Sequence, residues 1–145
     1  MHFETAPTFD GTSSYLGTTG NQALRMTTVV PSTVTRRVVA EGGTVGQHRV
    51  QIETSGAPVS HFLHVLQGRD AGGADLTISV ATTATGYTLT LTHPTRGSAV
   101  VTFERGPASA GGSFGYAASG TPTASALRGN VQGLRADYDG VAWLP

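Results

Sequence analysis

The sequence predicts an all-β protein, an antiparallel β-sandwich of short strands with little or no helix. Apolar and polar residues alternate over many short stretches, which is the period of a half-buried strand. Turn-forming clusters of Gly, Pro, Ser and Asp interrupt the chain roughly every eight to twelve residues, the spacing typical of sandwiches and open barrels. No window has a sustained helical period with capping residues at its ends.

Length and composition set the bounds of the prediction. The 145 residues are expected to form one domain, residues 1–145, large enough to bury a core. The absence of Cys excludes disulfides, thiolate metal sites and thiol catalysis. The formal net charge is zero, so a nucleic-acid partner, which calls for a basic excess, is not expected. No apolar stretch is long enough to span a membrane, so no membrane partner is expected either.

The N-terminal segment, residues 1–20, is expected to be loop-like. Gly and Pro punctuate it and no alternation is visible. Four apolar side chains are available to anchor it to a core, namely Phe3, Phe9, Tyr15 and Leu16.

Alternation and turn residues place the strands along the rest of the chain. The clearest pattern is at residues 86–93, where Tyr87, Leu89 and Leu91 face one way and three threonines face the other. The expected strands cover residues 24–30, 34–39, 47–53, 60–67, 75–81, 86–93, 99–105, 114–118, 126–128, 131–136 and 141–144.

Residues 47–53 and 60–67 are expected to be a pair of strands at the centre of the core. The first has one polar face, whereas the second is apolar on both faces, as in a strand in the middle of a sheet. Truncation of Leu66 to Ala is therefore expected to cost about 2–5 kcal/mol. The side chains expected to be nearly fully buried are Val50, Ile52, Phe62, Leu63, Val65, Leu66, Leu89 and Leu91.

The same stretch carries a family resemblance. The run MTTVVPSTVTRRVVAEGG at 26–43, QHRVQIE at 47–53 and SHFLHVLQ at 60–67 resemble the C-terminal β-region of heparinase II/III-like polysaccharide lyases. His48 stands where that family often has Trp, and Gln51 where it often has Glu. In the family, a helical toroid and an adjoining sheet carry the catalytic Tyr and His. The sequence has no toroid, so the resemblance implies a fold and a parent enzyme but transfers no catalytic residue.

No catalytic or metal site is predicted from the residues. His61 and His64 are three apart, which places them on opposite faces of a strand, so packed or hydrogen-bonded roles are expected. Tyr116 and Tyr138 lie near Gly-rich turns, but neither is paired with a His and an Arg at a diagnostic spacing. No cofactor is implied.

A carbohydrate-binding surface has more support. Exposed aromatic side chains can serve as stacking platforms for sugars, and the planar guanidinium of Arg suits carboxylate or sulfate groups. A single Trp near a chain end is also common as a core residue, so both roles remain open for Trp143. The candidate carbohydrate-binding residues are Arg25, Arg49, Tyr116, Tyr138 and Trp143.

The predicted function is that of a non-catalytic accessory module of a secreted or periplasmic bacterial enzyme that degrades polysaccharides, a polysaccharide lyase of the heparinase II/III-like kind. Its expected partners are an acidic polysaccharide, bound weakly, or the catalytic domain of the parent chain. Two alternatives remain, a small independent enzyme acting on polysaccharide and a structural or adhesive surface module.

Overall fold

The computed structural model describes residues 1–43, 46–57, 59–104 and 111–126. These residues form strands and no helix, so they contain no helix able to cross a membrane. All strand pairs are antiparallel, which confirms the predicted all-β fold of short antiparallel strands. The chain divides into two compact units, Met1–Asp75 (unit 1) and Leu76–Pro145 (unit 2), which are described separately. The single domain over residues 1–145 stays a prediction.

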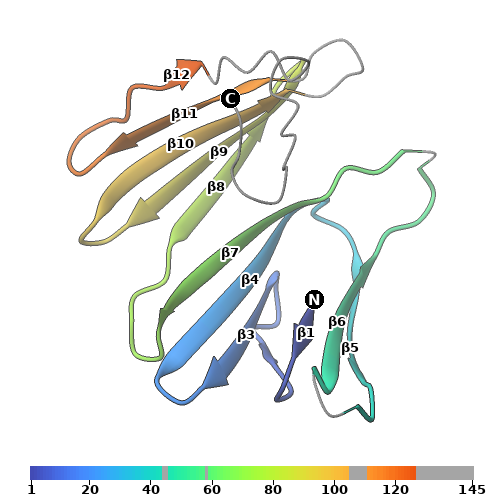
Figure 1. The fold of residues 1–145 in the computed structure, drawn as a ribbon. Helices are drawn as coiled ribbons and strands as arrows, with labels where there is room; N and C mark the ends of the chain where they lie inside the picture. Colours follow the sequence, from blue (N-terminus) through green and yellow to red (C-terminus); the bar gives the residue numbers. More distant parts are fainter. Residues whose placement is uncertain (44–45, 58, 105–110, 127–145) are drawn as a thin grey trace, which may run out of the picture. The chain divides into compact units, whose positions relative to one another are not determined.

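Unit 1 contains a three-stranded sheet in the order β1-β6-β5 and a four-stranded sheet in the order β2-β3-β4-β7 (Figure 1). Its strands are β1 (His2–Phe3), β2 (Thr8–Phe9), β3 (Ser14–Thr19), β4 (Gln22–Val30), β5 (Thr35–Ala40), β6 (His48–Glu53) and β7 (Leu63–Asp70).

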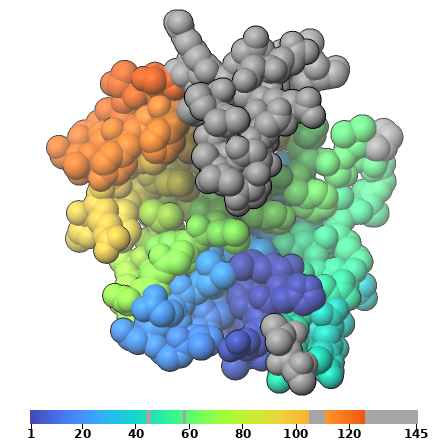
Figure 2. Space-filling model, viewed as in Figure 1, coloured from blue at the N-terminus to red at the C-terminus, as the bar shows by residue number. Residues whose placement is uncertain are grey.

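The two sheets of unit 1 meet through a small apolar core. Tyr15 of β3 and Met26 of β4 are cross-strand neighbours and pack against Phe3 and Val50 of the other sheet. Gly17 makes this approach possible, since a Cβ there would lie 2.3 Å from Cδ1 of Phe3. Figure 2 shows the N-terminal residues, in dark blue, seated against the blue surface of the β3–β4 hairpin.

The expected loop over residues 1–20 is wrong, because this segment contains three strands. β1 and β2 have two residues each, too short to show an alternation, and β3 pairs with β4 along its whole length. Two of the proposed anchors, Phe3 and Tyr15, are buried as expected. The N-terminal segment therefore contributes to both sheets of unit 1.

The expected pairing of residues 47–53 with residues 60–67 is also wrong. β6 lies between β1 and β5, whereas β7 pairs with β4 at the edge of the four-stranded sheet. The connection between β6 and β7 crosses from one sheet to the other instead of forming a hairpin. Alternation predicts which residues share a face but not which strand lies alongside.

The edge position of β7 alters the expected core. Val50, Val65 and Leu89 are buried as expected, and Ile52, Leu63 and Leu91 are half-buried. Two assignments are wrong, because Phe62 is 45% and Leu66 is 58% exposed. Leu66 shares a sheet face with Met26, its cross-strand partner, but lies in the outermost strand of four facing a sheet of three.

The described residues of unit 2 form a five-stranded antiparallel meander in the order β12-β11-β10-β9-β8. Residues 86–93 form a strand with the predicted bounds, whereas the strands expected at 131–136 and 141–144 lie outside the described residues. The strands are β8 (Thr77–Thr82), β9 (Gly86–His93), β10 (Gly97–Glu104), β11 (Gly112–Ala117) and β12 (Ser125–Ala126).

The sheet of unit 2 has two chemically different faces. One face is rich in Ser and Thr, and Thr102 there is hydrogen-bonded to Ser113 across the strands with 2.7 Å between the hydroxyl oxygens. The opposite face is apolar and includes the buried Leu89. This separation follows from the alternation that predicts the strands.

Met26→Ala and Leu66→Ala form a matched pair that tests the revised core. Met26 is 5% exposed, so its truncation should lower the free energy of unfolding by about 2–5 kcal/mol. Leu66 faces it across the strands but is exposed, so its truncation should cost less than about 1 kcal/mol. Urea unfolding followed by circular dichroism measures both. Equal losses would show that Leu66 belongs to the core after all.

Candidate functional site

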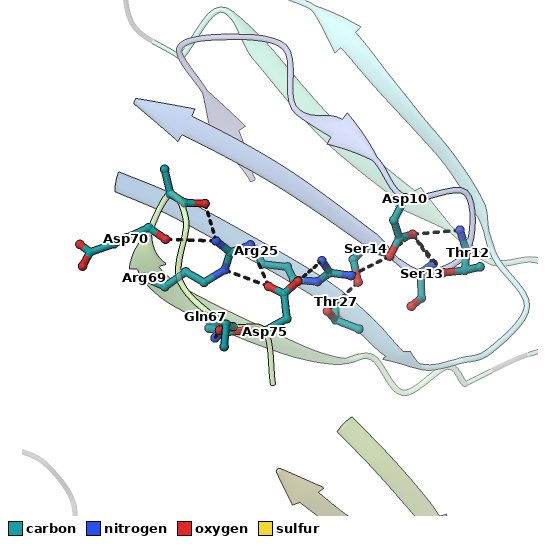
Figure 3. A network of polar contacts seen from close by, with 12 residues as sticks. Asp10, Thr12, Ser13, Ser14, Arg25, Thr27, Gln67, Arg69, Asp70 and Asp75 are labelled. Carbon is teal, nitrogen blue, oxygen red and sulfur yellow. Dashed lines mark hydrogen bonds and ion pairs between the residues drawn. The ribbon is translucent and has the colours of Figure 1, made fainter. Parts of the chain in front are cut away.

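Arg25, a candidate for glycan binding, belongs to a ladder of alternating charges on the outer face of the four-stranded sheet (Figure 3). Its Nη2 donates to Oδ2 of Asp10 and its Nη1 to Oδ2 of Asp75, both at 2.9 Å. Arg69 donates to the other oxygen of Asp75 through Nε at 2.8 Å. Two carboxylates already engage the Arg25 guanidinium, so a glycan carboxylate would have to displace one of them.

Asp10 ends this ladder on the side of the β2–β3 connection. Its Oδ1 accepts hydrogen bonds from the backbone amides of Thr12, Ser13 and Ser14 at 2.9–3.0 Å. Burial by itself would raise the pKa of Asp10, but these hydrogen bonds outweigh burial and hold the pKa well below the usual carboxyl range. Asp10 is therefore ionised wherever the protein is folded at ordinary pH.

Arg69 ends the ladder on the side where the chain leaves β7. Its Nη1 donates to the carbonyl oxygens of Asp70 and Ala71 at 3.1 and 2.9 Å, and its side chain is largely buried. Gln67 adds a hydrogen bond from its side-chain amide to the carbonyl of Ala74 at 2.9 Å. These contacts hold residues 71–75 against the sheet, so the ladder has a structural role.

Arg49 lies on the outer face of the three-stranded sheet, away from Arg25. Its Nε donates to Oε1 of Glu41 at 2.5 Å, and the other oxygen of Glu41 is 3.2 Å from Nδ1 of His2. The neighbouring cation, Arg37, pairs with Glu53 at 3.1 Å. Like Arg25, Arg49 already has a carboxylate partner within its own unit.

Arg36 lies on the face of β5 opposite to Arg37, toward the apolar core. Its Nε is buried without a hydrogen-bond partner in the described part of the chain. Tyr15 lies nearby; burial raises the pKa of its hydroxyl, and the positive charge of Arg36 partly offsets that effect. The positive charge of Arg36 therefore lies close to Tyr15, which belongs to the core of unit 1.

His64 is exposed but hydrogen-bonded, which is one of the two roles expected for it. Its Nδ1 lies 3.2 Å from Oγ1 of Thr28, and its ring stacks on Phe62 with 6.0 Å between centroids. Burial lowers the pKa of His64, so the neutral imidazole is favoured. Among the residues that the structure describes, no three His, Asp or Glu side chains are grouped to hold a metal ion.

A pocket of about 300 Å³ lies between β1 and the end of the β3–β4 hairpin. It is lined by residues 2–5, 17–19 and 22–24. That lining contains no Arg, so an acidic sugar would gain no guanidinium contact there. The pocket follows from the packing of Phe3 against Gly17.

Tyr116, the third candidate, lies on the apolar face of unit 2 within a row of exposed aromatic side chains. Tyr116 and Phe114 share one face of β11, and Phe103 lies on the same face of the neighbouring β10. Tyr116 is 57%, Phe114 48% and Phe103 40% exposed. We call these three residues the aromatic face.

The Tyr116 ring is held in a fixed orientation. Its hydroxyl donates a hydrogen bond to the backbone carbonyl oxygen of Arg96 at 2.5 Å. A ring fixed at its far end loses less conformational freedom when a ligand stacks on it. The remaining aromatic candidates, Tyr138 and Trp143, lie outside the described residues.

The structure thus separates the candidates instead of gathering them into one site. Arg25 and Arg49 lie on the outer faces of two different sheets of unit 1, and Tyr116 lies in unit 2. The aromatic neighbours Phe103 and Phe114 were missed at the sequence level. The alternation of side chains along residues 112–117 could have placed Phe114 and Tyr116 on the same face of the strand. No pattern in the sequence predicts that these aromatic residues are exposed.

Comparisons with protein families, with curated proteins and with solved structures found no match to this chain. The functional argument therefore depends on the geometry described above.

Asp10→Asn should make the stability of the protein less sensitive to acid. The pKa of Asp10 is lower in the folded than in the unfolded protein, so its stabilising effect is full above about pH 4 and is lost as the pH falls further. The free energy of unfolding of the wild type should therefore fall more steeply below about pH 4 than that of the variant. Urea titrations from pH 7 to pH 3 measure this difference.

At pH 7, Asp10→Asn should cost about 1 kcal/mol through the lost ion pair and weakened hydrogen bonds. Glu4→Gln, at an exposed carboxylate outside the ladder, controls for the change in net charge. Parallel pH profiles for Asp10→Asn and the wild type would refute the role assigned to Asp10.

Proposed function

We propose that the chain is a non-catalytic accessory module of a secreted polysaccharide-degrading enzyme and that its aromatic face binds carbohydrate. The observation that carries this proposal is the row of exposed rings on β10 and β11. Phe114 and Tyr116 lie two residues apart on β11, roughly 7 Å along the strand, and so point in the same direction. Phe103 pairs with Gly112, which places it diagonal to Phe114 at roughly 7–8 Å. A polysaccharide chain can lie along such a row with its sugar rings against the aromatic surfaces.

The chemistry of this surface favours sugar over a globular protein partner. Sugar rings present flat CH surfaces that pack on aromatic rings while their hydroxyls stay in water. The opposite face of the same sheet carries Ser and Thr side chains such as Thr102 and Ser113, so the exposed rings are confined to the aromatic face. The resemblance to heparinase II/III-like lyases also supports carbohydrate binding, and it is the reason for proposing a polysaccharide lyase as the parent enzyme.

A flat, open surface implies weak binding. A ligand on one sheet face keeps most of its own surface in water, unlike a ligand in a deep pocket. We therefore expect a dissociation constant of about 1 mM, or roughly −4 kcal/mol. Such an affinity suits a module that keeps an attached catalytic domain close to an insoluble or crowded polymer.

Tyr116→Ala should weaken oligosaccharide binding about two- to tenfold, because it removes the most exposed ring of the aromatic face. Phe114→Ala should act in the same direction. Tyr116→Phe keeps the ring but removes the hydrogen bond that fixes it, so it should bind more weakly than the wild type and more tightly than Tyr116→Ala. Amide NMR shifts during titration with cello- and uronate oligosaccharides give the dissociation constants and should move along β10 and β11.

Ser79→Ala is the matched control, since Ser79 is exposed on the opposite face of the same sheet. Trp143→Ala tests the remaining aromatic candidate. Loss of binding in Trp143→Ala with no effect of Tyr116→Ala would move the site away from the aromatic face. No shifts at millimolar ligand would leave a structural or adhesive module.

The purified chain should not cleave alginate, heparan sulfate, hyaluronan or chondroitin. Eliminative cleavage needs a base at the sugar C5 proton, and the Tyr116 hydroxyl is hydrogen-bonded to a backbone carbonyl with no carboxylate or imidazole contact among the described residues. The unsaturated uronate product absorbs in the ultraviolet, which gives the assay. Absorbance that grows with enzyme and vanishes in Tyr116→Phe would favour the independent-enzyme alternative.

A further inference from the structure

We infer that Arg96 gives the aromatic face a preference for acidic over neutral polysaccharide, so that a uronate carboxylate or a sulfate group binds its guanidinium. This inference rests on the proposed function, because it assigns the ligand class of the same surface. It concerns a residue outside the set that the sequence marks as candidates.

Arg96 is distinguished from the other described arginines by its surroundings. Four of them, Arg25, Arg37, Arg49 and Arg69, each pair with a carboxylate within 3.1 Å. Arg36 points into unit 1 next to its core. Within the described ranges, only Arg96 is exposed and has no carboxylate partner. Its guanidinium is thus available to an anion from solution.

The backbone brings Arg96 to the end of the aromatic face. Arg96 is the last residue of the turn between β9 and β10, and its carbonyl oxygen accepts the hydrogen bond from Tyr116. Gly97 permits this close approach: its φ is +93°, and a Cβ there would lie 2.1 Å from the carbonyl oxygen of Ala117. The turn therefore packs directly on β11, and Arg96 lies beside the most exposed ring.

Among the described residues of unit 2, no carboxylate compensates the charge of Arg96. Between residues 76 and 126, the described residues include one carboxylate, Glu104. Glu104 follows Phe103 on β10 and so lies on the opposite face of the sheet. The backbone of Arg96 contacts Tyr116 and its side chain is exposed, so a ligand on the aromatic face lies within reach of a positive charge and meets no described negative charge. This favours an anionic sugar over a neutral one.

The guanidinium fork selects the chemistry of the ligand. It can donate two parallel N–H bonds to a carboxylate or sulfate, which a sugar hydroxyl cannot match with the same charge assistance. Because Arg96 is exposed, the gain is modest and screened by salt over a Debye length of about 8 Å at physiological ionic strength. The predicted signature is a salt-dependent preference on top of salt-independent stacking.

The test compares a uronate oligosaccharide with a neutral oligosaccharide of equal length in NMR titrations of the full chain. The wild type should bind the uronate about two- to fivefold more tightly at low salt, and the difference should shrink as salt is added. Arg96→Gln should remove the preference and leave neutral binding unchanged, because the carbonyl that anchors Tyr116 remains. Arg96→Lys should retain part of it.

Arg37→Gln is the matched control, because it removes the same charge from an exposed site in unit 1. If Arg37→Gln also removed the preference for uronate over neutral oligosaccharide, the preference would depend on net charge alone. That result would refute the role of Arg96. Unchanged uronate affinity in Arg96→Gln, with binding of both ligands still weakened in Tyr116→Ala, would refute the acidic preference and leave the stacking surface intact. Absence of binding by either ligand would overturn both proposals.

Discussion

The packing of one aromatic ring over one glycine organises unit 1. Phe3 reaches the four-stranded sheet only because Gly17 has no side chain, and its ring then joins Tyr15, Met26 and Val50 in the contact between the sheets. These four residues come from four strands, so the core ties the N-terminal strand, the β3–β4 hairpin and β6 together. Since so few side chains are shared between the sheets, each one carries a large part of the packing energy.

Because the core of unit 1 is small, polar contacts cover the outer faces of its sheets. This explains why several of its arginines form ion pairs there. Arg25 and Arg69 alternate with Asp10 and Asp75 on one sheet, and Arg49 pairs with Glu41 on the other. Partly exposed ion pairs add little stability individually, but this ladder, in which the Arg69 side chain is largely buried, fixes the strand connections at its two ends. The same pairing removes these cations from the set available to a ligand.

In this chain, the sequence predicts where strands lie better than it predicts which strands pair with each other. The alternation at residues 86–93 gives both the strand and its apolar face correctly. It could not show that β6 and β7 belong to different sheets, or that an apolar strand such as β7 lies at an edge, because pairing depends on contacts far apart in the chain. The same limit applies to the site. The exposure of Tyr116, and the lack of a described carboxylate partner at Arg96, follow from the arrangement of strands and carboxylates, which no local pattern encodes.

A weak site on a flat face is effective only if something holds it near its ligand. Linking a module to a catalytic domain makes its second binding event intramolecular, at effective concentrations that reach millimolar for short linkers. A dissociation constant of about 1 mM then gives substantial occupancy while allowing rapid release as the enzyme moves along the polymer. A deep, tight pocket would oppose that movement. The proposed accessory role therefore suits an exposed aromatic face with Arg96, which has no carboxylate partner among the described residues, at its end better than the role of a binding protein acting alone would.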